Sequence, residues 1–183
     1  LANMSITDEA TPEFSRIIKL DEIGRTRWPA HVVANEAERV ALSVRFAFAA
    51  LDSLEADYTF SRENDRIQAT GEIRAALSQP CVVTGEPVAE TVRESFFIRF
   101  VPKGDNPAPQ GDDEIELDAD ECDLIPYANE RIDIGEAVAE TLALSVNPYP
   151  RSEQADTILR EAGVLSEEQA GPFAMLAGLK GKA

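Results

Sequence analysis

The chain has 183 residues, 44% of them hydrophobic, which suits one domain with a substantial core and is too short for two comfortable ones. Its 34 acidic and 17 basic residues give a formal net charge of −17. A field of this sign repels polyphosphate, so it argues against nonspecific nucleic-acid binding and favours a basic partner. No run approaches the roughly 18 to 20 consecutive apolar residues of a membrane span, so we expect a soluble protein without membrane attachment.

The cysteine content and the N-terminus indicate the cellular compartment. Cys81 and Cys122 lie far apart in the sequence, and no apolar leader precedes them. This pattern is typical of a reducing cytosol, so we expect a cytoplasmic protein. Residues 1–3 resemble a remnant of an expression vector, and residues 4–183 are interpreted as a single domain that begins naturally at Met4.

The first expected elements are a short strand over residues 14–20, an irregular segment over residues 21–29 and a helix after Asn35. Asn35 and Glu38 have the spacing of a capping box. The helix is predicted to end near Phe46 or Phe48. Its predicted buried face consists of Ala37, Val40, Ala41 and Val44.

Alternation of apolar and polar residues predicts three strands, over residues 54–61, 66–77 and 88–101. A turn at residues 63–65 joins the first two, and another at residues 84–87 precedes the third. The second strand's register continues through Cys81. Together the strands form an antiparallel meander with one buried face. The apolar positions on that face are Leu54, Ala56, Tyr58, Phe60, Ile67, Ala69, Gly71, Ile73, Ala75, Leu77, Val92, Phe96, Ile98 and Phe100.

Residues 103–123 combine glycines and prolines with a dense acidic run, and they bury too little apolar surface to offset their ordering entropy. We therefore expect a mobile acidic loop. Asp133 and Glu136 then cap a helix that ends near Ser145 and buries Ile134, Val138 and Leu142. Residues 152–171 are expected to be polar and partly helical, and a last short helix is expected to start at residue 172.

These elements predict an α+β fold. A twisted antiparallel sheet, which the strand at residues 14–20 joins, packs its apolar face against two or three helices. The acidic loop lies outside that core.

Few side chains are suited to catalysis. His31 is the single histidine, and its apolar neighbours favour a structural role over that of a base for a nucleophile. A structural zinc ion needs four nitrogen or sulfur ligands, more than His31, Cys81 and Cys122 supply. Cys81 is interpreted as a small apolar residue on the inward face of a strand. We therefore expect no enzyme activity, no metal and no cofactor.

The acidic run at residues 118–123 places carboxylates at alternating positions, as calcium sites do. Asp123 occupies the position where an EF-hand requires glycine, so a solvated acidic loop is the better interpretation. The sequence contains no glycine-rich phosphate loop and no aromatic RNA-binding signature.

Three kinds of surface residue are candidates for contacting a partner. Glu136 and Glu140 lie four apart on the exposed side of their helix, where paired like charges suit a cation. An apolar stripe near the C-terminus either docks on the chain's own sheet or binds a partner. The polar sheet face collects arginines that are able to contact phosphates, although pairing with Glu72 and other surface acids explains them better. These arginines are Arg66, Arg74, Arg93 and Arg99.

Three motifs, in this order, resemble the YceD family. They are a cysteine beside a turn, an acidic helix with a Pro-Tyr-Pro exit, and a Pro-Phe-Ala-x-Leu-x-x-Leu-Lys ending. Here they occupy residues 81–87, 132–151 and 172–180, and the resemblance runs from about residue 54 to the C-terminus. Many members carry Cys-x-x-Cys where this chain has Cys81 and Thr84, and some carry further cysteines near the C-terminus. Because this chain lacks those cysteines, we do not carry their metal binding over.

The family consists of small bacterial and plastid proteins needed for accumulation of large-subunit ribosomal RNA, with no established enzymatic activity. The resemblance therefore implies a non-enzymatic factor in ribosome biogenesis. Given the charge of −17, we expect its acidic surface to bind a basic ribosomal protein or another assembly factor. The residues predicted to bind that partner are Glu136, Glu140, Tyr149, Arg151, Phe173, Leu176, Leu179 and Lys180.

Two other functions stay open. One is direct RNA binding through the arginine-bearing sheet face. The other is an rRNA-processing nuclease, which would need convergent carboxylates to hold magnesium, whereas the acids here are scattered along the sequence.

Overall fold

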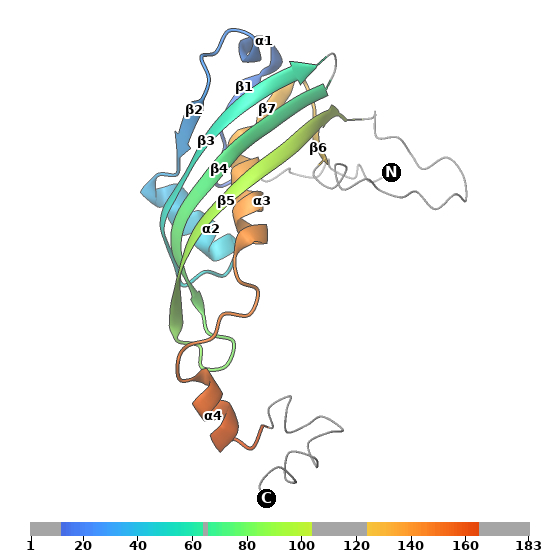
Figure 1. Ribbon diagram of the computed structural model, residues 1–183. Helices are drawn as coiled ribbons and strands as arrows, with labels where there is room; N and C mark the ends of the chain where they lie inside the picture. Colours follow the sequence, from blue (N-terminus) through green and yellow to red (C-terminus); the bar gives the residue numbers. More distant parts are fainter. Residues whose placement is uncertain (1–11, 64–65, 104–123, 165–183) are drawn as a thin grey trace, which may run out of the picture.

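The computed structural model describes residues 12–63, 66–103 and 124–164 (Figure 1). Its main element is a five-stranded sheet of order β2-β3-β4-β5-β6, which curves around the helices α2 (Glu36–Arg45) and α3 (Ile134–Ser145). The expected α+β class is confirmed. The strands are β2 (Ala30–Val33), β3 (Ala50–Glu63), β4 (Arg66–Pro80), β5 (Pro87–Pro102) and β6 (Leu124–Tyr127).

The predicted meander forms the centre of this sheet. β3, β4 and β5 pair antiparallel, and in their register Tyr58 lies opposite Gly71, which lies opposite Phe96. Every apolar position predicted for the inward face is buried except Gly71, which is half-buried. The alternation was a reliable guide because one face of each strand packs on the core and the other meets solvent.

The edges of the sheet differ from the prediction. β2 pairs antiparallel with β3, and β6 pairs parallel with β5; neither strand was expected. The strand expected over residues 14–20 is shorter, β1 (Ile17–Lys19), and its expected place in the meander is wrong. It pairs instead with β7 (Arg131–Asp133) in a separate two-stranded sheet. The Asp133 carboxylate explains this placement, because it accepts a hydrogen bond from the Arg16 backbone N–H at 2.7 Å.

Helix α2 (Glu36–Arg45) begins at the predicted capping box. The Asn35 side chain accepts from the Glu38 N–H at 3.0 Å, and the Glu38 carboxylate accepts from the Asn35 N–H at 2.7 Å. The predicted buried face is wrong: Val40 and Val44 are 61% and 79% exposed, and Leu42 is buried instead. Burial of the larger Leu42 side chain in the core favours this orientation, and Glu38 forms an ion pair with Arg16 at 2.7 Å in it.

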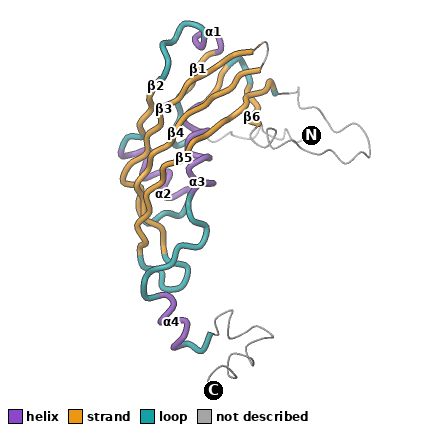
Figure 2. Tube along the Cα trace, in the orientation of Figure 1, coloured by secondary structure: helices purple, strands orange, loops and turns teal. Residues whose placement is uncertain are grey.

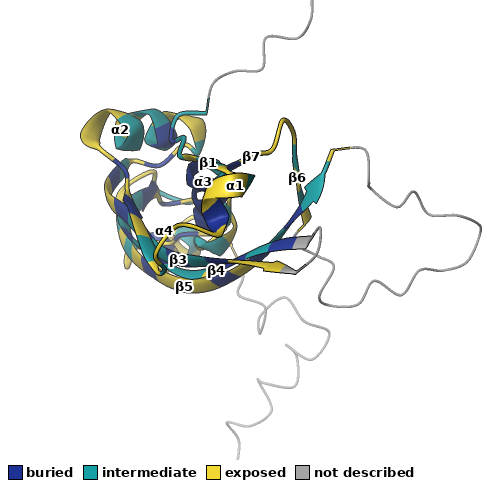
Figure 3. Cartoon of the chain, turned by 90° about the horizontal axis from the view of Figure 1, so that it is seen from above, coloured by how far each residue is buried: buried dark blue, intermediate teal, exposed yellow. Residues whose placement is uncertain are grey.

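Helix α3 (Ile134–Ser145) confirms the second predicted helix and its cap. The Asp133 carboxylate accepts from the backbone N–H groups of Gly135 and Glu136 at 3.1 and 3.2 Å. The predicted inward residues Ile134, Val138 and Leu142 are fully buried. Viewed from above, α3 lies inside the curve of the sheet (Figure 3). The sheet's concave face and this helix therefore share one core.

Two short helices complete the described chain. α1 (Leu20–Ile23) interrupts the segment expected to be irregular, and α4 (Ala155–Glu161) confirms that residues 152–171 are partly helical. α4 lies beyond the turn between β4 and β5, away from the main core (Figure 2). The acidic loop beyond Lys103 and the helix expected from residue 172 lie outside the described residues. No helix in the described ranges is long and apolar enough to cross a membrane.

Candidate interaction site

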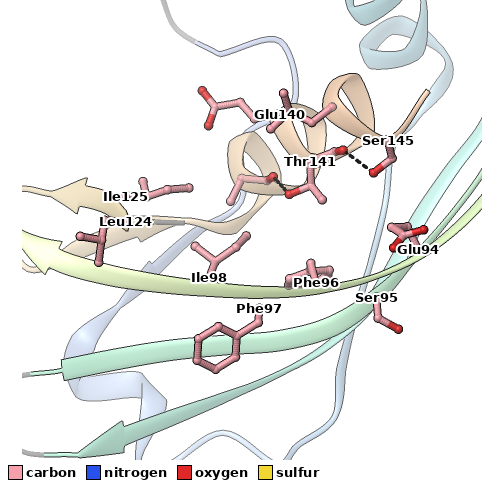
Figure 4. A pocket seen from close by; sticks show the side chains of 12 residues that line it. Glu94, Ser95, Phe96, Phe97, Ile98, Leu124, Ile125, Glu140, Thr141 and Ser145 are labelled. Atoms are coloured by element: carbon pink, nitrogen blue, oxygen red, sulfur yellow. Dashed lines mark hydrogen bonds between the residues drawn. The ribbon is translucent and has the colours of Figure 1, made fainter. Parts of the chain in front are cut away.

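A groove of about 330 Å³ runs between α3 and β5 and reaches β6 at one end (Figure 4). Phe96 and Ile98 of β5 line one side. Residues of α3 line the other side, and two carboxylates flank the apolar surface. The complete lining is Glu94, Ser95, Phe96, Phe97, Ile98, Leu124, Ile125, Ala137, Glu140, Thr141, Leu144 and Ser145.

The β5 wall follows from the strand's alternation. Even-numbered residues face inward, so Phe96 and Ile98 are buried, and Glu94 takes an inward position although its side chain is exposed. Figure 4 shows the side chains of Ser95 and Phe97 pointing away from the groove. The sequence did not single out Glu94, although a charged residue between the inward Val92 and Phe96 was a signal that could have identified it.

The α3 wall is lined by small side chains and one exposed leucine. The Thr141 hydroxyl donates to the Ala137 carbonyl at 2.8 Å, and the Ser145 hydroxyl donates to the Thr141 carbonyl at 2.7 Å (Figure 4). Both hydroxyl donors are thus satisfied within the helix. Leu144 is 85% exposed at the rim. Together with the Glu140 carboxylate, the wall therefore offers both apolar and charged contacts to anything that enters the groove.

One edge of β5 is open along this groove. β5 pairs with β4 from Pro87 to Phe100, but β6 covers its other side only from Arg99 to Pro102. Within the described ranges, no strand pairs with that side of residues 88–98. Lys103 donates its N–H to the Tyr127 carbonyl at 2.8 Å, so by alternation Ser95 and Phe97 direct their backbone groups toward the same edge. Such an edge is a template for another strand.

The groove carries two carboxylates that no described cation pairs with. Neither Glu94 nor Glu140 forms an ion pair with any described residue. The pKa of Glu140 is raised, first by partial burial of its carboxyl group and then by the neighbouring Glu136, while Arg45 acts weakly in the opposite direction. A cation that entered the groove would relieve this unfavourable environment.

The other described residues that were predicted to bind a partner lie outside the groove. Glu136 binds Arg45 at 2.7 Å, and Arg45 also binds Glu13 at 2.9 Å. Tyr149 is 73% exposed, and Arg151 pairs with Asp156 at 3.4 Å. Of the predicted set, the structure thus places only Glu140 in the groove. Phe173, Leu176, Leu179 and Lys180 lie outside the described residues.

The arginines of the outer sheet face are engaged by acids. Arg74 contacts Asp57 at 2.6 Å, Glu55 at 2.8 Å and Glu72 at 3.1 Å. Arg93 contacts Glu72 at 3.0 Å, and it and Arg74 lower the pKa of that carboxyl group. The positive charges of Arg74 and Arg93 are therefore offset locally.

The contacts of Arg99 and His31 on this face differ from those of Arg74 and Arg93. The Arg99 guanidinium lies 5.4 Å from the centre of the Phe97 ring. The Arg66 side chain lies outside the described part of the structure. His31 was expected among apolar neighbours, yet the pairing of β2 with β3 places its Nδ1 2.8 Å from the Asp57 carboxylate. His31 thus belongs to the surface ion-pair cluster.

Cys81 lies in the turn after β4, so the expectation that the strand continues through it is wrong. Its sulfur is buried and accepts hydrogen bonds from the backbone N–H groups of Ser152, Thr84 and Val83 at 3.2, 3.4 and 3.5 Å. Burial raises the pKa of the thiol, but the donors from Thr84 and Ser152 outweigh it and lower the pKa to about 6. The thiolate thus links the β4–β5 turn to the chain after α3.

This shift predicts a pH-dependent contribution to stability. The folded-state pKa of the Cys81 thiol is about 6 and the ordinary value is 9.0. Between these two pH values, the unfolded chain keeps the thiol proton that the folded chain has lost. The contribution should therefore grow as pH rises from 6 to 9 and be lost as pH falls through 6. Urea unfolding of the Cys122→Ser protein, with and without Cys81→Ala, measures it. A stability difference that stays constant over this range would contradict the prediction.

Within the described residues, no group of three or more His, Cys, Asp or Glu side chains is arranged to hold a metal ion.

Comparison with known protein families gives a match over more than half of the chain. No curated protein and no solved structure matches the chain. A family model described as "Large ribosomal RNA subunit accumulation protein YceD" matches residues 69–180, which include both walls of the groove and the Cys81 turn. The chain therefore belongs to the YceD family.

Proposed function

We propose that this protein is a non-enzymatic cytoplasmic factor in biogenesis of the large ribosomal subunit, which binds a basic ribosomal protein or assembly factor through its acidic surface. Membership of the YceD family implies a role in accumulation of large-subunit ribosomal RNA. The observation that carries the proposal is the pair Glu94 and Glu140, whose carboxylates line the groove beside apolar residues and form no ion pair with a described residue. The net charge of −17 draws a basic partner toward this surface.

The charge distribution also favours a protein partner over RNA. Exposed ion pairs contribute only about 0.2–1 kcal/mol each, so Arg74 and Arg93 can be released from their acids at little cost. The released carboxylates of Asp57 and Glu72 would then lie beside any incoming phosphate. A basic protein meets no such repulsion, and it gains apolar contact in the groove as well.

Affinity purification of the tagged full-length protein at low and moderate salt tests the proposal, with bound proteins and bound RNA both identified. We expect a basic ribosomal protein or assembly factor that persists at moderate salt and after ribonuclease treatment. Its purified form should then bind the protein directly. Recovery of no basic protein of this kind at moderate salt would overturn the proposal.

RNA that persists after proteins are removed would instead favour direct RNA binding through the arginine face. In that case, replacing Arg74, Arg93 and Arg99 together should lower RNA affinity and flatten its salt dependence. Under the proposed function, the same triple variant retains its basic protein partner.

A further inference from the structure

We propose that the groove binds its partner by strand addition, in which an extended cationic segment pairs with the open edge of β5. This inference rests on the proposed function, because the occupant is a segment of the basic partner. It adds the mode of binding and the sequence pattern of that segment.

The open edge has defined ends. At one end, β6 pairs with β5 from Arg99 onward. At the other end, the chain leaving α3 is fastened to β5, because the Asn147 N–H donates to the Glu90 carboxylate at 2.9 Å. Residues 91–98 remain between them. At about 3.3 Å per residue, this edge suits a strand of roughly six to eight residues, close to the usual strand length.

The backbone of this edge supplies the pairing groups. Ser95 and Phe97 direct their N–H and C=O groups away from β4, by alternation from the hydrogen bond that the Lys103 N–H donates to the Tyr127 carbonyl. An added strand would therefore extend the sheet without displacing any β4–β5 hydrogen bond. This is the general geometry by which sheet edges bind extended peptides.

The walls of the groove determine which side chains the segment carries. Alternate residues of an added strand would lie in the same row as Glu94, Phe96 and Ile98 and would face α3. Near Phe96 and the exposed Leu144, an apolar residue is favoured. Beside Glu94 and Glu140, lysine or arginine is favoured because neither carboxylate pairs with a described cation. Every second residue of the segment should thus face the groove, and these inward-facing residues should include both apolar and basic ones.

The same charges argue against a second copy of this chain. Two β5 edges paired across a twofold axis would bring the Glu94 carboxylates close together, and each chain carries a net charge of −17. An inward-facing charged residue is also a known protection of edge strands against self-pairing. Glu94 therefore disfavours self-association while it attracts a basic segment.

Fluorescence anisotropy with the full-length protein tests this mode. The probe is a labelled synthetic peptide of about ten residues that carries valine and lysine in turn at every second position, with threonine between them, so that one face presents both. Two further peptides have the same sequence but carry N-methyl groups on alternate residues, which remove the N–H donors of one edge. One is methylated at the odd positions and the other at the even positions, so one of them lacks the donors that would face β5. We expect one N-methylated peptide to bind at least about tenfold more weakly than its parent.

Protein variants locate the binding surface. Glu94→Gln combined with Glu140→Gln should weaken the parent peptide by about tenfold. The matched control, Glu153→Gln with Glu161→Gln, removes the same charge near α4 and should change affinity by less than about twofold. Ser95→Pro removes one N–H from the open edge, without removing a β4–β5 bond, and should also weaken binding.

The outcomes separate this inference from the proposed function. If both N-methylated peptides bind as tightly as the parent while the Glu94/Glu140 variant still weakens binding, strand addition is wrong and the acidic-surface function stands. If no peptide binds and no basic protein is recovered from cells, both are wrong. Binding that appears only after removal of residues 172–183 would identify the chain's own tail as the occupant. A dimer that Ser95→Pro dissociates would identify a second copy, and either result overturns the inference.

Discussion

Gly71→Ala is expected to destabilise the protein by about 3 kcal/mol, the upper part of the range for overpacking a close-packed site. Gly71 lies in β4 between Tyr58 of β3 and Phe96 of β5. An alanine Cβ would overlap the Asp57 carbonyl oxygen and lie 2.6 Å from Phe96 Cζ. The carbonyl belongs to the backbone of the neighbouring strand, so it cannot move aside without disturbing the β3–β4 pairing.

Urea unfolding measures this effect, with Gly24→Ala as the matched control. A Cβ at Gly24 would meet nothing within 4 Å, and the residue has an ordinary negative φ of −77°. The control should therefore be neutral or slightly stabilising. A loss below about 1 kcal/mol for Gly71→Ala would show that the sheet accommodates the methyl group by a small shift. Because Phe96 lines the groove, Gly71→Ala should also weaken peptide binding.

The meander could be predicted because its information is local. Between Leu54 and Phe100, each strand has one buried and one solvated face, so period-two alternation specifies both the strands and their orientation. β2 and β6 have only four residues each, and β2 buries only Val32. Segments this short carry no usable period. Their positions depend on pairing with β3 and β5, which distant residues decide.

The orientation of α2 shows a second limit. Its sequence offers Val40 with Val44 on one side and Leu42 on another, and helical spacing alone does not select between them. In the structure Leu42 joins the common core, and Glu38 binds Arg16 while Arg45 binds Glu136. These partners lie 22 and 91 residues away in the sequence, so no local pattern reports them.

The candidate site was predictable only in part. Glu140 followed from the acidic spacing of α3, and Glu94 could have been found as a charged residue at an inward position of β5. The open edge could not be found in this way. It exists because β6 runs parallel to β5 and covers it only from Arg99 to Pro102, and no sequence pattern indicates where that pairing stops.

Asp133→Ala should destabilise the protein by about 4 kcal/mol, because one carboxylate joins three segments of the chain. It caps α3 by accepting from the Gly135 and Glu136 N–H groups, and it accepts from the Arg16 N–H at 2.7 Å and the Ser15 hydroxyl at 2.5 Å. Loss of a helix cap alone costs about 1 kcal/mol. Hydrogen bonds to a charged group add about 1.5–3 kcal/mol each when lost, so the contacts to residues 15 and 16 should dominate.

Two variants separate the cap from the long-range contacts. Asn35→Ala removes only the cap of α2 and should cost about 1 kcal/mol in urea unfolding. Asp133→Asn keeps an oxygen acceptor for the helix but weakens the remaining bonds, so its loss should fall between those of Asn35→Ala and Asp133→Ala. If Asp133→Ala costs no more than Asn35→Ala, the bonds to Ser15 and Arg16 contribute nothing measurable and the two-stranded sheet does not help to hold α3.

Asp133→Ala also tests how the groove is positioned. α3 forms one wall, and its first turn lies against the N-terminal segment, because a Cβ at Gly135 would come within 2.5 Å of the Phe14 carbonyl oxygen. When the Asp133 bonds are lost, this contact should loosen and the amides of α3 should exchange hydrogen faster than those of β4. The β5 edge is held independently by β4, so the lysine–valine peptide should lose affinity through its apolar contacts while keeping its dependence on backbone N–H groups.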